Sequence, residues 1–267
     1  MEKISLPKKI EFKKGTEAGI GDIIVEPLYP GYGMTLGNSL RRVLLSSLPG
    51  AAVVGVKIKG ASHEFMAIPH IKEDVLEMVL NLKQLRLKIH GEEEIKLEVS
   101  VSGKKVVTAA NITKNSQVEI ANPDLVLANI TDPAGNLTMD IYVRPGRGYH
   151  MPEGVKKENA EIGYIEVDSI FSPVLAVSID VENVRVGKMT NWDKLVIHVK
   201  TDETITFEEA FNESVKVLID QFSSLLPESE REEALTEAAA EPIIAVEETE
   251  AVEAEEKGKK IKKTKKK

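Results

Sequence analysis

Residues 86–150 form a series of short runs in which apolar and polar residues alternate. A period of two is typical of a strand with one buried face. Turn signals such as Ser102-Gly103 and Asn122-Pro123 separate the runs, and strands joined this way form antiparallel hairpins. The sequence therefore predicts a β-rich module. Its predicted strands are residues 95–101, 105–109, 118–120, 124–128 and 137–143.

A helical stripe precedes this module. Leu36, Leu40 and Leu44 recur with the spacing of one face of a helix, together with Val43 and Leu48. Thr35 is placed to cap the start of this helix, and Pro49-Gly50 ends it.

A second stripe follows the module. Thr206 and Glu209 form a capping box, and the apolar stripe behind it stops at Pro227. A third periodic stretch covers residues 71–85, where the acidic pair Glu73-Asp74 suits a helix start. Further strands are predicted at residues 9–13, 22–28, 52–59, 164–167, 174–181 and 194–201, with a loop before the last. Helices and antiparallel strands in this order indicate an α+β fold.

Charge is distributed unevenly along the chain. The net charge is −8; residues 228–256 hold twelve Glu against one Arg, and residues 257–267 hold eight Lys and no acid. We expect residues 228–267 to be a disordered tail, acidic and then basic. The remaining body is acidic, so it is a poor general binder of duplex DNA.

The composition argues against disulfide bonds, against zinc–thiolate sites and against a membrane location. The chain has no cysteine, so it has neither disulfides nor zinc–thiolate sites. It has no apolar run of membrane-spanning length and no signal-peptide core at its N-terminus. We therefore expect a cytoplasmic protein that does not enter the membrane.

The segment YPGYGMTLGNSLRR, residues 29–42, offers an alternative function. A free-standing nucleotide-binding enzyme could use the 31–37 glycine loop, because glycines and a helix start can cradle phosphate. A P-loop needs Lys-Ser/Thr after its last glycine, and Gly37 is followed by Asn38-Ser39. The five histidines also lack metal-site spacing. The sequence predicts no active site, no metal and no cofactor on this chain.

The far side of the first predicted helix carries an apolar residue next to an arginine. Asn38, Arg42 and Leu45 fall nearly opposite the Leu40–Leu44 stripe, where a solvated face is expected. An exposed Leu beside an Arg fits an ordinary helix back, and it also fits a docking surface, since arginine with an apolar neighbour is a common interface anchor.

The segment EPLYPGYGMTLGNSLRRVLLSSLPGAAVVGVKIKG closely resembles the alpha subunit of bacterial DNA-directed RNA polymerase. The resemblance continues in order through HEF (63–65), EDVLEMVLNLKQL (73–85), VTAANI (107–112), VRPGRGY (143–149), FSPV (171–174) and VENVRVGKMTNWDKLVI (181–197). It covers nearly all of residues 1–227.

The resemblance implies a fold of two subdomains. Residues 1–50 and 173–227 would form a dimerisation subdomain with two helices on an antiparallel sheet, and residues 51–172 would form an inserted β-rich subdomain. The implied function is a homodimeric scaffold that nucleates assembly of the beta and beta-prime subunits. The chain would be a non-catalytic subunit of a nucleotidyltransferase.

The resemblance also assigns residues. Asn38, Arg42 and Leu45 match the positions through which an alpha subunit of this family binds the beta subunit. A second set matches regions that face the large subunits: Lys83, Arg185, Lys188, Thr190, Asp193 and Lys194. The implied dimer interface comprises Tyr32, Leu36, Leu40, Val43, Leu44, Phe207, Phe211, Leu218 and Phe222.

The C-terminus departs from the family. Bacterial alpha subunits usually carry a small helical domain that binds promoter DNA, and residues 228–267 have neither the length nor the composition to encode it. The resemblance therefore implies assembly without promoter-element recognition, and DNA contact only indirectly or weakly through the Lys-rich tail.

Overall fold

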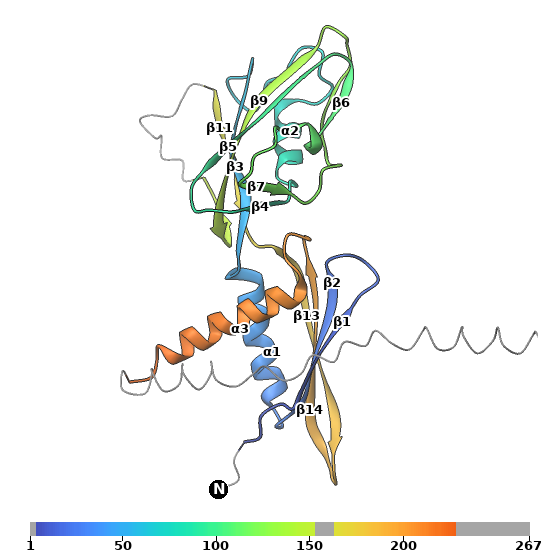
Figure 1. Ribbon diagram of the computed structural model, residues 1–267, viewed down its shortest axis with the longest axis vertical. Helices are drawn as coiled ribbons and strands as arrows, with labels where there is room; N and C mark the ends of the chain where they lie inside the picture. The colour runs from blue at the N-terminus through green and yellow to red at the C-terminus, as the bar shows by residue number, and fades with distance from the viewer. Residues whose placement is uncertain (1–3, 153–162, 228–267) are drawn as a thin grey trace, which may run out of the picture.

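Antiparallel strands dominate the structure, as the alternating runs predict. The computed structural model describes residues 4–152 and 163–227; the predicted tail at 228–267 lies outside these residues. In the described ranges, antiparallel sheets combine with three α-helices in two bodies (Figure 1). The α+β class is therefore confirmed.

The lower body in Figure 1 is a four-stranded sheet with two helices on one face. Its strand order is β1 (Lys9–Lys14), β2 (Ile20–Leu28), β14 (Met189–Thr201) and β13 (Val174–Val186). Helices α1 (Tyr32–Ser46) and α3 (Phe207–Ser223) cross on this sheet. Ile23 and Ile197 from the strands form one core with Leu44 and Phe211 from the helices.

The upper body is built on a six-stranded sheet with path β5-β9-β3-β4-β7 and with β11 paired to β3. Ribbons β6–β8 and β10–β12 complete it. The bounds are β3 (Pro49–Ile58), α2 (Val75–Leu82), β4 (Leu87–Ile89), β5 (Ile95–Ser102), β6 (Lys105–Thr108), a 3₁₀ turn at Ala109–Asn111, β7 (Val118–Ile120), β8 (Val126–Ile130), β9 (Asn136–Arg147), β10 (Tyr149–His150), β11 (Tyr164–Glu166) and β12 (Ser169–Ile170).

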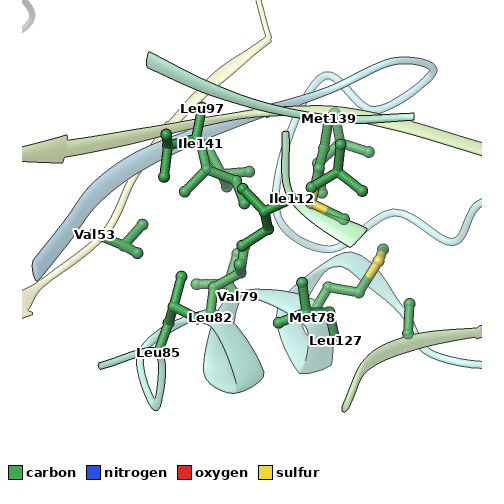
Figure 2. Packing of buried hydrophobic residues seen from close by; sticks show 14 of the residues in the cluster. Val53, Met78, Val79, Leu82, Leu85, Leu97, Ile112, Leu127, Met139 and Ile141 are labelled. Carbon is green, nitrogen blue, oxygen red and sulfur yellow. The ribbon is translucent and has the colours of Figure 1, made fainter. Parts of the chain in front are cut away.

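A second, separate core fills the upper body. Met78, Val79 and Leu82 of α2 face Leu97 and Ile141 of the sheet, as Figure 2 shows. The acidic pair before this helix has the structural role expected of it. Asp74 is the N-cap and accepts a hydrogen bond from the Glu77 amide at 2.7 Å.

Glu73, the other acid of this pair, ties the start of α2 to β8. Its two carboxylate oxygens each accept a hydrogen bond from Asn129, one from the backbone amide and one from the side-chain amide, both at 2.6 Å. Burial is the largest single influence and raises the pKa of Glu73, but the hydrogen bonds to the carboxylate together outweigh it, so the pKa lies below its ordinary value.

The glycine loop predicted at residues 31–37 is wrong in its geometry. Only Gly31 precedes α1, as its N-cap with φ 88°, and Gly33 and Gly37 are buried inside the helix. Thr35 is therefore a helical residue rather than the cap, and its hydroxyl donates to the Gly31 carbonyl at 3.3 Å. The two inner glycines are required by packing: a Cβ on Gly37 would lie 2.9 Å from Leu195 Cδ1.

The loop predicted before residue 194 is also wrong. β13 continues to Val186 and β14 begins at Met189, so the two strands form one long hairpin. Residues 183–192 of this hairpin extend past the end of β2, whose last partner on β14 is Asp193. The polar residues of this stretch suggested a loop because the ribbon has no sheet neighbour there to bury them.

The capping box at Thr206 and Glu209 is confirmed, and α3 ends at Ser223.

Charged residues cover the outer face of the lower sheet. Lys9 lies opposite Glu26, and Lys194 lies opposite Glu182, with a Nζ–Oε2 distance of 2.9 Å in the second pair. Opposite charges facing each other across strands stabilise a solvated sheet face modestly.

His198 is part of the same face. Its Nδ1 lies 2.6 Å from Asp22 on β2, and its Nε2 lies 3.2 Å from Asp180 on β13. Hydrogen bonding to Asp22 is the main cause that raises the pKa of His198, and burial opposes it. Lys13 on β1 lies opposite Asp22 in the strand register.

We expect protonated His198 to stabilise the lower sheet. Because its folded pKa is raised, this contribution is full below the unfolded value near 6.5 and is lost as pH rises through the folded pKa. Urea unfolding between pH 5.5 and 8.5 should show a fall in the free energy of unfolding that His198→Gln removes. His90→Gln serves as the histidine control. An unchanged pH profile in His198→Gln would contradict this role.

Candidate interaction surfaces

The exposed face of α1 carries the three residues that the resemblance assigns to beta binding. Asn38, Arg42 and Leu45 follow one another at i, i+4 and i+7, and all three are exposed. Asn38 Nδ2 donates to the Met34 carbonyl at 3.0 Å. No ion pair joins Arg42 to another residue within ranges 4–152 and 163–227. The guanidinium is therefore presented to solvent beside an apolar side chain.

Asp193 connects the start of α1 to β14. It is 8% exposed, and its Oδ2 accepts hydrogen bonds from the amides of Gly31 at 2.9 Å and Gly33 at 3.0 Å. These amides are the groups that a glycine-rich phosphate site would use. A carboxylate of the chain itself occupies that position, which argues against nucleotide binding there.

Lys83 lies at the end of α2 in an ion pair with Asp168. Its Nζ is 2.7 and 2.6 Å from the two carboxylate oxygens, and the Tyr149 hydroxyl donates to the same carboxylate at 3.2 Å. Hydrogen bonding from Lys83 is the main cause that lowers the pKa of Asp168. Leu80 and Ile170, 51% and 64% exposed, lie beside this pair in a shallow cleft.

The remaining large-subunit candidates lie on the β13–β14 hairpin. Arg185 Nε donates to the Gly187 carbonyl at 2.9 Å and so shapes the tip, where Lys188 and Thr190 are exposed. Lys194 is held by Glu182, and Asp193 points toward α1. The hairpin thus presents only part of the predicted set to solvent.

The candidate dimer residues divide into two groups. Leu40, Leu44, Phe207 and Phe211 are buried in the core of the lower body. A second group is exposed or partly exposed along α1 and α3: Tyr32, Leu36, Val43, Leu218 and Phe222. Phe222 is 61% exposed, and Ile219 and Leu225 near it are exposed as well.

One relevant residue, Asp168, was missed from the sequence. Asp168 is 85 residues from Lys83, and no local pattern links them.

Among the described residues, no group of three His, Asp or Glu side chains is arranged to hold a metal ion. No described helix combines the length and apolar character that crossing a membrane requires.

Known proteins resemble this chain over most of its length. Residues 56–172 match the family described as RNA polymerase Rpb3/RpoA insert domain. The chain is similar to the DNA-directed RNA polymerase subunit alpha of Carboxydothermus hydrogenoformans, with 49% identity over 211 residues, 79% of this chain and 67% of the relative. It is also similar to that of Oceanobacillus iheyensis, with 46% identity over 240 residues, 89% of this chain and 76% of the relative.

We expect Lys83→Met to raise the pKa of Asp168 toward its ordinary value, because the cation that stabilises the carboxylate is removed. Carboxyl ¹³C NMR titration of Asp168 measures this shift. In the wild type, the pair stabilises the fold above the unfolded pKa of Asp168, and this contribution is lost as pH falls through the lowered folded value. Lys88→Met is the control, and an unshifted Asp168 titration in Lys83→Met would contradict the pairing.

Proposed function

Because the chain belongs to the family of bacterial DNA-directed RNA polymerase alpha subunits, we propose that it is a homodimeric assembly scaffold for the beta and beta-prime subunits. In this proposal the large subunits carry the chemistry, and this chain contributes neither an active site nor a cofactor. It works in the cytoplasm, and it contacts DNA at most weakly through its tail.

The observation that carries the proposal is the apolar surface that α1 and α3 leave uncovered. The two helices pack together on the lower sheet, and both extend exposed apolar side chains beyond their own core, including Leu36 and Phe222. Exposed apolar residues gathered on neighbouring elements are typical of association surfaces. A second copy of the same helices is the partner we propose for them.

The proposed division of the chain follows the two cores. Residues 1–50 and 173–227 form the dimerisation subdomain, and residues 51–172 form the β-rich insert. Support comes from the two separate clusters of buried residues, one around Leu44 and Ile197 and the other around Met78 and Ile141. Each subdomain therefore has a hydrophobic core of its own.

Recognition of the large subunits uses the polar surfaces. We assign the Asn38, Arg42 and Leu45 face to beta. Lys83 and the β13–β14 hairpin are assigned to beta and beta-prime together. A symmetric dimer presents each surface twice, and two different partners use the two copies unequally. In the part of the chain that the structure describes, the Arg42 guanidinium has no ion-pair partner, and this supports the assignment because the side chain is available for an acidic partner group.

We expect Arg42→Ala to abolish capture of beta while the chain stays dimeric. Truncating a desolvated interface charge costs about 2–5 kcal/mol, and α1 packs through its opposite face. Co-purification with tagged beta measures capture, and light scattering measures the dimer. Arg41→Ala, which removes a neighbouring charge that is also exposed, is the matched control. Normal recovery of beta with Arg42→Ala would refute the assignment.

We expect Phe222→Asp to shift the chain from dimer to monomer. The side chain is mostly exposed in one protomer, so its loss spares the protomer's core but removes an apolar contact from each half of the interface. A central aromatic contact is worth about 2 kcal/mol or more. Sedimentation at micromolar concentration measures the change, with Gln221→Ala as the control on the same helix. A dimer as tight as wild type would argue against this face.

A further inference from the structure

The start of α1 is anchored by a residue from a distant part of the chain. The N-cap residue Gly31 has no side chain, and the first turn of the helix contains no acidic residue. The amides of Gly31 and Gly33 donate instead to Asp193, which is about 160 positions away on β14. The first amides of a helix lack partners within it and carry partial positive charge, so a buried carboxylate satisfies them well.

The backbone of α1 lies very close to the β13–β14 hairpin around Asp193. A Cβ on Gly33 would lie 3.0 Å from Asp193 Oδ2 and 2.9 Å from Val181 Cγ1. One turn later, Gly37 makes the same close approach to Leu195, two residues beyond Asp193 on the strand. The helix therefore contacts the hairpin at two successive turns, through backbone that only glycine can bring so close.

This anchor joins two surfaces that the proposed function assigns to the large subunits. On the helix side, the Arg42 face begins with Asn38, directly after Gly37. On the strand side, Asp193 is the point at which β14 leaves its pairing with β2 and continues into the hairpin tip. The rotation and axial position of α1 therefore determine where the Arg42 face lies relative to the tip.

We propose that Asp193 is a positioning residue for subunit recognition. Its carboxylate fixes α1 on the β13–β14 hairpin, so that a large subunit meets the Arg42 face and the hairpin tip at one fixed spacing. Asp193 acts from inside the fold and does not contact the partner. This inference rests on the proposed function and gives Asp193 a different role from the contact role that the family resemblance implies.

The first test uses the full chain without a partner. In D193A, hydrogen exchange at residues 31–36 should accelerate about tenfold, because two amides lose their acceptor. In D193N, the side-chain carbonyl can accept the same two hydrogen bonds, so most protection should return. Thr190→Ala, at the hairpin tip, should leave exchange in α1 unchanged. Wild-type exchange at residues 31–36 in D193A overturns the inference. D193S replaces D193A if that variant does not fold.

The second test measures affinity for the cognate beta subunit. D193A should weaken binding about tenfold, and D193N should restore most of it. Leu45→Ala should cost less in the D193A background than in wild type, because the misplaced helix has already lost part of that contact. Additive losses would show that Asp193 acts independently of the α1 face. If the wild-type chain does not bind beta, that result counts against the proposed function. The hydrogen-exchange result by itself then decides whether Asp193 positions α1.

Discussion

The close approach of the α1 backbone to the β13–β14 hairpin determines which residues of α1 are buried in the lower body and which are exposed on its surface. Gly33 and Gly37 let the helix lie against Val181 and Leu195, and no larger residue fits without displacing them. That contact turns Leu40 and Leu44 into the core and leaves Arg42 outside. The same glycines suggested a phosphate site in the sequence, because a glycine pattern records only that a backbone must approach something closely.

The two helices of the lower body each have some apolar residues in the protomer's core and others exposed, and we propose the exposed ones for association. Phe207 and Phe211 pack with Phe12 inside the protomer, whereas Phe222, near the end of α3, is exposed. A protomer can therefore complete its core before it meets a second copy. The upper body has its own core, so its surfaces can diverge without disturbing the helices that we propose for the dimer.

Local periodicity predicted most of the elements, because α2 and strands such as β5, β7 and β9 bury one face against a single core. It failed where distant residues decide the outcome. The N-cap of α1 was assigned to Thr35, since nothing near it in sequence reveals that Asp193 supplies the acceptor. Only the projecting end of the β13–β14 hairpin was read as a loop, because polar residues dominate the stretch between the two predicted strands. For the candidate surfaces, periodicity placed Asn38, Arg42 and Leu45 on one face, but it gave no sign of the ion pair between Lys83 and Asp168.

The charged rows on the outer sheet face have a consequence for the protein before assembly. β1 and β13 are the outermost strands of an open sheet, and such strands can template pairing with another chain. β1 carries Lys9, Glu11, Lys13 and Lys14 within six residues, and β13 carries Asp180 and Glu182. If the lower sheets of two protomers stacked or paired edge to edge, these charged side chains would be brought together and would lose their hydration. These charges thus protect a single protomer from aggregation through its sheet, whatever its exposed helices bind.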